Sequence, residues 1–186
     1  MRVIAGKLRG RPLKAPRGLD TRPTSDRARE AIFQILGNLD GLRVVDCYAG
    51  TGAMGIEALS RGALHAVFIE PDRAALHTIK DNLDKLGQKA HATVLEVPVE
   101  KARSRLEKLA PFDLVLSDPP WRIAQLGAVA VARLFAGLLA KDARVLLGHP
   151  AAQPVTLSED SGLELADRRK WGGSGMSFFE IPNKNE

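Results

Sequence analysis

The sequence of 186 residues contains one cysteine, few aromatic side chains (5%), and no apolar run long enough for a membrane helix, which needs roughly 18 residues. A single cysteine, Cys47, excludes an intramolecular disulfide and a zinc site built from cysteines, so we expect no metal centre. The first residues hold no long apolar stretch of the kind that forms a secretory signal. We therefore expect a cytoplasmic, monomeric protein whose length suits one domain with a basic arm.

The basic residues are concentrated at the start of the chain. Residues 1–29 hold nine Lys and Arg against two acidic residues, so this part carries +7, whereas the whole chain carries +5. We call residues 1–29 the basic N-terminal arm and residues 30–186 the main domain. A basic segment on a near-neutral body is a candidate footprint for a polyanion such as RNA, and a solvated tail is the alternative. The candidate contacts are Arg2, Lys7, Arg9, Arg11, Lys14, Arg22 and Arg27.

Beyond the arm, strand-like and helix-like patterns alternate. Thr24 or Ser25 can cap a first helix that ends at Gly37, with Ile32 and Ile35 on its apolar face. Strands are predicted at 42–47, 66–70, 93–97, 113–117 and 143–148, and the later helices at 72–86, 101–109 and 126–140, with another that ends near 62. Residues 163–181 predict a hairpin that turns at 171–175. The pattern predicts an α/β fold with a doubly wound, mostly parallel sheet and a C-terminal antiparallel hairpin.

A glycine-rich turn joins the first predicted strand to the next helix. Gly50 and Gly52 allow a tight turn and close approach of a ligand, and Gly55 allows the helix to pack closely on the sheet. Glu70 ends the following strand, 20 residues after Gly50, where a carboxylate can accept hydrogen bonds from both ribose hydroxyls. The combination indicates a nucleoside cofactor.

Asp46 distinguishes between two kinds of cofactor. A carboxylate at this strand end would repel a pyrophosphate but attract an amino group, which favours S-adenosylmethionine over a dinucleotide. An alternative role for Asp46 is to cap the turn by accepting hydrogen bonds from backbone N–H groups.

The sequence Asp-Pro-Pro-Trp at residues 118–121 follows the fourth predicted strand. The Asp118 carboxylate and the Pro119 carbonyl can accept hydrogen bonds from a planar exocyclic amine and favour the pyramidal geometry that it needs as a nucleophile. Trp121 offers a face on which a base that has left its own stack can lie. A strand-ending turn with a core tryptophan is the structural alternative.

With these motifs, the chain resembles the bacterial 16S rRNA (guanine(966)-N(2))-methyltransferases, class I S-adenosylmethionine-dependent enzymes. The matching runs are 2–10, 21–30, 46–62, Glu70, 118–121 and 169–172. The resemblance implies a seven-stranded sheet with one antiparallel strand, and methyl transfer to guanine N2 in rRNA of the small ribosomal subunit. It implies as partner the 16S rRNA, the small subunit or an assembly intermediate.

One departure from the family pattern concerns the cofactor's adenine. Pro98 stands where relatives usually have an Asp that contacts this ring. We therefore expect the backbone N–H of Val99 to donate to adenine N1 and Glu100, in preference to Glu96, to accept from its amine. Water at the edge of the cleft is the alternative acceptor.

Three other functions share parts of this pattern. A DNA adenine-N6 methyltransferase uses similar acid-Pro-Pro-aromatic chemistry, but its target recognition normally needs more chain than the arm offers. The arm also argues against a release-factor glutamine methyltransferase. The intact Asp118 and glycine turn argue against a non-catalytic RNA-binding or assembly protein on the same fold.

Overall fold

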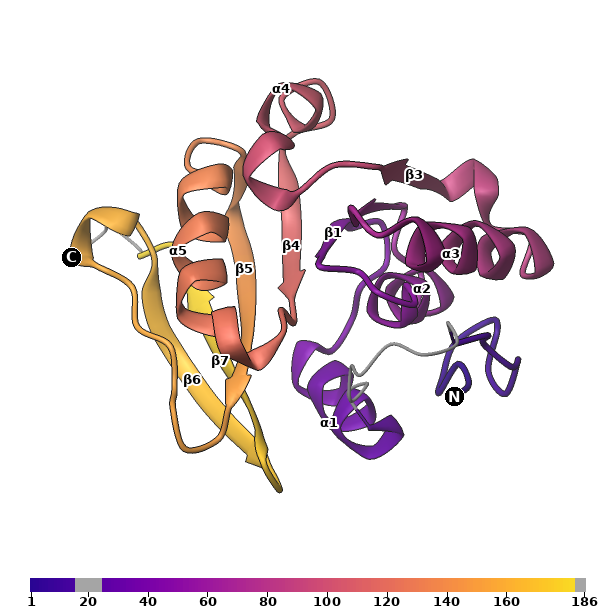
Figure 1. Ribbon diagram of the computed structural model, residues 1–186, viewed down its shortest axis with the longest axis horizontal. Coiled ribbons are helices and arrows are strands. Elements are labelled where there is room, and N and C mark those ends of the chain that lie inside the picture. The colour runs from indigo at the N-terminus through magenta and orange to yellow at the C-terminus, as the bar shows by residue number, and fades with distance from the viewer. Residues whose placement is uncertain (16–24, 183–186) are drawn as a thin grey trace.

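Seven strands form one sheet in the order β3-β2-β1-β4-β5-β7-β6 in the computed structural model, which describes residues 1–15 and 25–182 (Figure 1). Strands β1 to β5 run parallel, and β7 is antiparallel to both β5 and β6. The strands are β1 (Arg43–Cys47), β2 (His65–Ile69), β3 (Ala92–Leu95), β4 (Phe112–Ser117), β5 (Leu139–Pro150), β6 (Glu164–Trp171) and β7 (Ser174–Glu180). The predicted α/β class, with its doubly wound sheet and C-terminal hairpin, is confirmed.

Helices cover both faces of this sheet. They are α1 (Asp26–Leu36), α2 (Ala53–Ser60), α3 (Arg73–Lys85), α4 (Arg103–Leu106) and α5 (Ala124–Phe135), with 3₁₀ turns η1 (Lys89–His91), η2 (Val99–Lys101), η3 (Trp121–Ile123) and η4 (Glu159–Ser161). Val44 and Leu116 point to the face that α1, α2 and α3 cover. Their neighbours Val45 and Val115 point to the face that α4 and α5 cover. This alternation buries the central strands on both sides.

The order of the strands reverses between β1 and β4, and ligands of open α/β sheets bind beyond the carboxyl ends of the strands at such a point. The register pairs Cys47, the last residue of β1, with Ser117, the last residue of β4. The glycine turn after β1 and the loop 118–121 after β4 therefore start side by side.

The first helix begins as expected and buries Ile32 as predicted, but Ile35 lies outside its buried face. The Ser25 hydroxyl accepts a hydrogen bond from the N–H of Ala28 at 3.2 Å, and Gly37 ends α1 with φ 70°. Ile35, expected on the apolar face, is 41% exposed, whereas Phe33 is fully buried. The buried face is rotated because it must also include Arg29, whose guanidinium bonds to the carbonyl of Arg2 and to Asp26.

Two later boundaries also differ from the prediction. The helix predicted at 101–109 is the four-residue α4, which η2 precedes. Within this stretch, Ala102 and Leu106 are fully buried. The helix predicted at 126–140 is shorter, since α5 ends at Phe135 and β5 has already begun at Leu139. The longer β5 is paired with β4 on one side and with β7 on the other.

Residues 1–15, which we call the N-terminal segment, pack against α2 and α3. The carboxylate of Glu57 accepts hydrogen bonds from the N–H groups of Ile4 at 2.7 Å and Ala5 at 3.0 Å. Val3 and Leu13 are buried in the core. This part of the predicted arm is therefore attached to the main domain and is not a solvated tail. The boundary predicted at residue 29 falls inside α1, and Arg22 lies outside the described residues.

Candidate active site

The glycine turn after β1 has the backbone that its sequence requires. Gly50 and Gly52 have φ 54° and 76°, in the left-handed region that side chains with a Cβ rarely adopt. A Cβ at Gly55 would stand 2.4 Å from the ring of Phe68 in β2, so this glycine lets α2 lie close to the sheet, as predicted. The turn and the first turn of α2 thus form a close-fitting backbone surface at the end of β1.

Glu70 ties this turn to the end of β2. One carboxylate oxygen accepts from the N–H of Gly50 at 2.8 Å, and the other accepts from the N–H of Asp72 at 2.9 Å. Glu70 is buried, yet each of its oxygens keeps a second lone pair for a hydroxyl group. Its position fits the predicted contact with ribose, and it also holds the glycine turn in place.

Asp46 is buried beneath the same turn. Its carboxylate accepts from the N–H of Gly55 at 2.8 Å, which confirms its interaction with the turn backbone. Burial, together with the charges of Asp118 and Glu70, raises the pKa of Asp46 to about 8. The charges of Asp118 and Glu70 thus act on the Asp46 carboxyl group, and a ligand with positive charges relieves the repulsion among the three. S-adenosylmethionine carries a positively charged sulfonium and an amino group, so these three carboxyl groups fit it.

The loop 118–121 begins beside the glycine turn. Asp118 is half-buried, Pro119 is buried, and the side chain of Trp121 remains 44% exposed at the mouth of the site. Trp121 is thus not a core tryptophan, and a base can reach its ring. The arrangement places an acid, a carbonyl and an aromatic face together at the carboxyl end of β4.

Three glycines that sequence reasoning did not select support this loop. A Cβ at Gly148 in β5 would stand 2.3 Å from a carboxylate oxygen of Asp118, and one at Gly127 in α5 would stand 3.1 Å from the ring of Pro119. A Cβ at Gly173, in the turn between β6 and β7, would make only an ordinary contact with the edge of Trp121 at 3.4 Å. No local motif marks these positions, because each glycine is more than seven residues from the residue that it supports.

On the side expected to hold adenine, Val99 is buried, whereas Pro98 and Glu100 are exposed. No hydrogen bond recorded for the described residues uses the N–H of Val99. Tyr48 has φ 56°, and within the described part of the chain its buried hydroxyl has no hydrogen-bond partner. Burial and the charge of Glu100 raise the pKa of Tyr48 to about 12, so Glu100 lies near this hydroxyl.

His149, to which sequence reasoning assigned no role, follows Gly148 and is buried. One ring nitrogen lies 2.9 Å from the Ser177 hydroxyl and the other 2.8 Å from the carbonyl of Pro150. Arg168 donates to the same hydroxyl at 3.0 Å. This network fixes the end of β5 against the β6–β7 hairpin.

The basic side chains of the N-terminal segment divide into two groups. Lys14 forms an ion pair with Asp81 at 2.7 Å, and Arg11 donates to the carbonyl of Lys85 at 3.2 Å. Lys7 and Arg9 are exposed and have no ion-pair partner among the described residues. Arg2 lies 3.9 Å from Asp26, and Arg27 in α1 is exposed.

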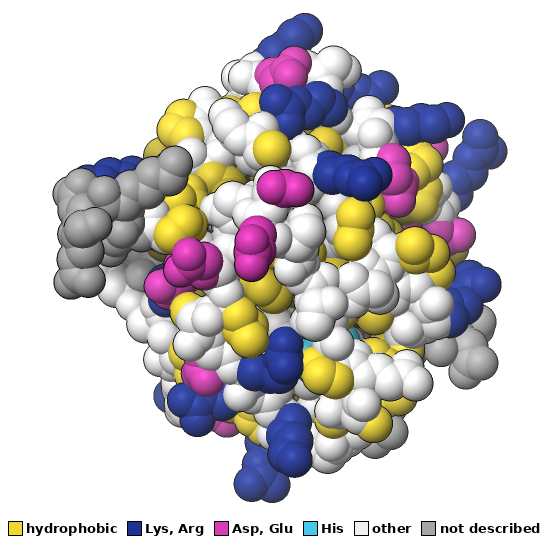
Figure 2. Space-filling model, turned by 90° about the vertical axis from the view of Figure 1, so that its left-hand side faces the viewer, with side chains coloured by type: hydrophobic (Ala, Val, Ile, Leu, Met, Phe, Trp, Pro, Cys, Tyr) yellow, Lys and Arg dark blue, Asp and Glu magenta, His cyan; other side chains and the backbone are white. Residues whose placement is uncertain are grey.

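Further basic residues lie on the C-terminal hairpin. Arg168, Arg169 and Lys170 stand near the end of β6, and the register of Pro150 with Ser174 places the hairpin turn at the carboxyl end of β5. Seen from the side of β6, Lys and Arg side chains lie at the lower end of the molecule and also over its upper end (Figure 2). None of the helices built by the described residues has the length and apolar character that crossing a membrane requires.

The sheet order, the glycine turn with its two acids and the loop 118–121 define a class I S-adenosylmethionine-dependent methyltransferase. The family model described as "Conserved hypothetical protein 95" matches residues 1–180, and the chain belongs to this family.

The chain is similar to curated proteins and to a solved structure. It is 36% identical to "Putative rRNA methyltransferase YlbH" of Bacillus subtilis, over 97% of this chain and 98% of that protein. It is 41% identical to "Ribosomal RNA small subunit methyltransferase D" of Escherichia coli, over 66% of this chain and 61% of that protein. The solved structure "Putative methyltransferase yhhF from Escherichia coli" superimposes with a TM-score of 0.80 at 32% identity, covering 97% of each chain.

Proposed function

We propose that this protein transfers a methyl group from S-adenosylmethionine to the exocyclic N2 amine of a guanine in 16S rRNA of the small ribosomal subunit. The observation that carries the proposal is the position of Asp118, Pro119 and the exposed Trp121 beside the glycine turn. The names of the two curated relatives support rRNA as the substrate. An rRNA substrate in turn places the reaction in the cytoplasm.

The chemistry required of these residues is to activate a weak nucleophile. When bound, S-adenosylmethionine supplies a methyl group on a positively charged sulfur. The guanine amine is a poor nucleophile because its lone pair is delocalised into the ring. By accepting hydrogen bonds from its two N–H groups, the Asp118 carboxylate and the Pro119 carbonyl localise the lone pair on nitrogen. As the new C–N bond forms, the bond between the methyl carbon and sulfur breaks, and its electron pair stays on sulfur to give S-adenosylhomocysteine. The nitrogen must then lose a proton, and the Asp118 carboxylate is the acceptor at hand.

Trp121 and the basic residues bind and orient the RNA in this proposal. A base within a helix cannot enter the cleft, so the target guanine leaves its stack and lies against the exposed ring of Trp121. Lys7, Arg9 and Arg27 are exposed and can contact phosphates. The corresponding role of Arg22 remains a prediction from the sequence.

Methylation of small ribosomal subunits tests the proposal. Subunits from a strain that lacks the enzyme would be incubated with the protein and labelled cofactor, and the modified nucleotide would be mapped. We expect a single N2-methylguanine, with Asp118→Ala at least about 100-fold slower while it still binds S-adenosylhomocysteine. Label on DNA adenine instead of rRNA, or near-normal turnover by Asp118→Ala, would contradict the proposed reaction.

A further inference from the structure

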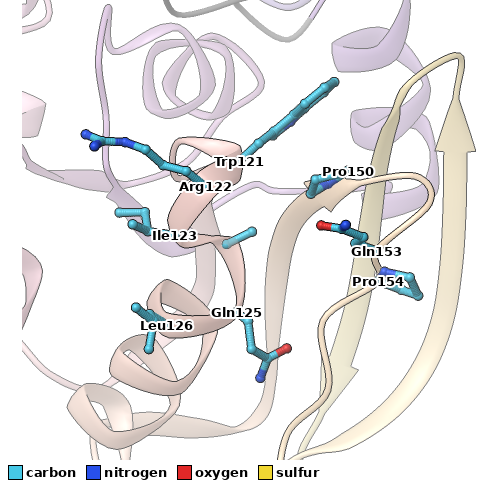
Figure 3. Close-up of a pocket in the computed structure, with 9 residues that line it drawn as sticks. Trp121, Arg122, Ile123, Gln125, Leu126, Pro150, Gln153 and Pro154 are labelled. Atoms are coloured by element: carbon cyan, nitrogen blue, oxygen red, sulfur yellow. The ribbon is translucent and has the colours of Figure 1, made fainter.

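A cavity of about 230 Å³ lies next to Trp121, between η3 with the start of α5 and the loop that follows β5 (Figure 3). Ala124 and Leu126 line it on the helical side, and Pro150, Gln153 and Pro154 line it on the loop side. Neither Asp46 nor Glu70 borders it, so the cavity is separate from the residues assigned to the cofactor. It is smaller than the roughly 300–1,000 Å³ pockets that hold drug-sized ligands, which suits a single ring system.

Hydrogen bonds hold the walls of this cavity in place. The side-chain amide of Gln125 donates to the carbonyl of Thr156 at 2.7 Å and accepts from its N–H at 3.0 Å, which joins α5 to the loop. The N–H of Gln153 donates to the carbonyl of Pro150 at 3.0 Å. The N–H of Ala151 donates to the carbonyl of Gly173 at 2.8 Å. The cavity therefore exists before any ligand binds.

The chemistry of the walls suits a flat, uncharged ring with a polar edge. Trp121 and the two prolines give rigid apolar surfaces, and the Gln153 amide offers both a donor and an acceptor. The Gln153 side chain makes no hydrogen bond recorded within residues 1–15 and 25–182. In Figure 3 the side chain of Arg122 points away from Pro150 and Gln153, so its cation does not face into the cavity. Arg122 is thus the lining residue with a positive charge, and its side chain is turned away from the loop, whereas a nucleobase finds stacking surfaces and a hydrogen-bonding group between the walls.

We propose that this cavity binds the base of a nucleotide adjacent to the target guanine in the RNA, an inference that rests on the proposed function. When the target leaves its stack, its neighbour loses a stacking partner. The cavity replaces that partner with the ring of Trp121 and the surfaces of Pro150 and Pro154. Trp121 then stands between two bases, with the target on the side of Asp118 and the neighbour on the side of Gln153. Occupation of the cavity stabilises the open RNA conformation that methylation requires.

Binding of RNA with one missing base tests this inference. After the methylated nucleotide has been mapped, fragments of the same rRNA would be made with an abasic site immediately before or after it. Affinities would be measured with S-adenosylhomocysteine bound. We expect one of the two abasic fragments to bind the wild-type protein about tenfold more weakly than the intact fragment, because the stacking of one base is removed.

Variants that fill the cavity make the test specific. Ala124→Leu places extra volume in the cavity from the helix, and Gln153→Trp does so from the exposed loop, so that one remains usable if the other unfolds. In either variant we expect the intact RNA to bind about tenfold more weakly and the abasic site to weaken binding no further. Arg133→Ala is the matched control: it removes an exposed charge of α5 that does not line the cavity, and it should change binding of intact and abasic fragments by the same factor.

The outcomes separate this inference from the proposed function. If the wild-type protein methylates no rRNA, the proposed function fails. If it methylates rRNA but the abasic penalty is absent, or is the same in the filled variants, the cavity does not hold a neighbouring base. Normal binding of RNA fragments combined with weak binding of whole subunits by the filled variants would indicate a protein occupant and would overturn the inference.

Discussion

The α-carbon of Gly148 in β5 lies directly behind the carboxylate of Asp118: a Cβ at Gly148 would stand 2.3 Å from an oxygen of Asp118 and 3.1 Å from its Cα. Gly148 does not have a positive φ, so an alanine fits the backbone there. The nearest atom that an alanine would displace is a carboxylate oxygen, which can rotate away, and the Cα of Asp118 needs to move by only a few tenths of an ångström. Gly148→Ala should therefore fold but hold the Asp118 carboxylate, proposed above to be catalytic, in the wrong position.

We expect Gly148→Ala to lower kcat by about 10- to 100-fold, because misplacing a hydrogen-bond acceptor costs catalysis more than binding. Affinity for S-adenosylhomocysteine and KM for the RNA should stay close to the wild-type values. Gly173→Ala is the control, since its Cβ would make only an ordinary contact with Trp121 at 3.4 Å. Equal kcat for both variants would show that Gly148 does not position Asp118.

Glu70 should determine cofactor affinity through two effects. Glu70→Ala removes the predicted ribose acceptor and also the carboxylate that holds Gly50 and Asp72. We expect S-adenosylhomocysteine to bind at least about tenfold more weakly, as measured by calorimetry, because hydrogen bonds to a charged group are removed. Glu70→Asp, with its shorter reach, should fall between the two proteins. Equal affinity of all three proteins would remove Glu70 from the cofactor site.

Asp46 predicts a pH dependence of both stability and binding. Because its pKa in the folded protein is about 8, well above the ordinary value of 3.8, folding favours the protonated form. The protonated Asp46 therefore contributes to the free energy of unfolding. This contribution is fully present below about pH 4 and is lost as the pH rises through about 8. Asp46→Asn should therefore raise the melting temperature of the cofactor-free protein at pH 9 and have little effect at pH 4.

Whereas folding favours the protonated form of Asp46, binding of the cofactor should favour its ionised form. A cationic ligand favours the ionised Asp46, so affinity for S-adenosylmethionine should rise as the pH increases from 6 to 8. Calorimetry in buffers of different ionisation enthalpy should detect release of up to about one proton per bound cofactor near pH 7. In Asp46→Asn this release should disappear. Proton release that persists in this variant would assign it to another group.

Glu100 is predicted to accept a hydrogen bond from the adenine amine in place of the missing acid at Pro98. We expect Glu100→Gln to bind S-adenosylhomocysteine about threefold to tenfold more weakly, because a charged acceptor is replaced by a neutral one. An N6-dimethyl analogue, which cannot donate, should bind the wild-type protein more weakly than the natural ligand, and this penalty should shrink in the variant. An unchanged penalty would favour water as the acceptor.

The N-terminal segment should supply part of the affinity for RNA. In the double variant Lys7→Ala with Arg9→Ala we expect weaker binding, and a salt dependence whose logarithmic slope falls by about 0.7–0.9 for each phosphate that the protein no longer neutralises. Cofactor affinity should not change. Lys108→Ala with Lys141→Ala removes the same charge near the amino ends of β4 and β5 and should leave the slope unaltered. Equal slopes for the two double variants would exclude Lys7 and Arg9 from the RNA interface.

Local patterns in the amino-acid sequence predicted the fold class and the candidate residues of the cofactor turn. The candidate cofactor residues Gly50, Gly52 and Glu70 could be identified from the sequence. They belong to a turn, a helix start and a strand end, which are local features with a fixed spacing. Asp118 and its neighbours were recognisable for the same reason. Helix ends and buried faces, such as the exposed Ile35 and the short α4, were less predictable because tertiary packing decides them.

The way in which distant parts of the chain complete the site follows from the folded structure and not from any local pattern. It placed Gly148 behind Asp118, the hairpin turn with Gly173 against Trp121, and the N-terminal segment on Glu57. These interactions join residues between 30 and more than 50 positions apart, and neither partner carries a local pattern that names the other. The physical reason is that close packing at the carboxyl ends of β4 and β5 depends on the shape of the assembled sheet, which no single segment encodes.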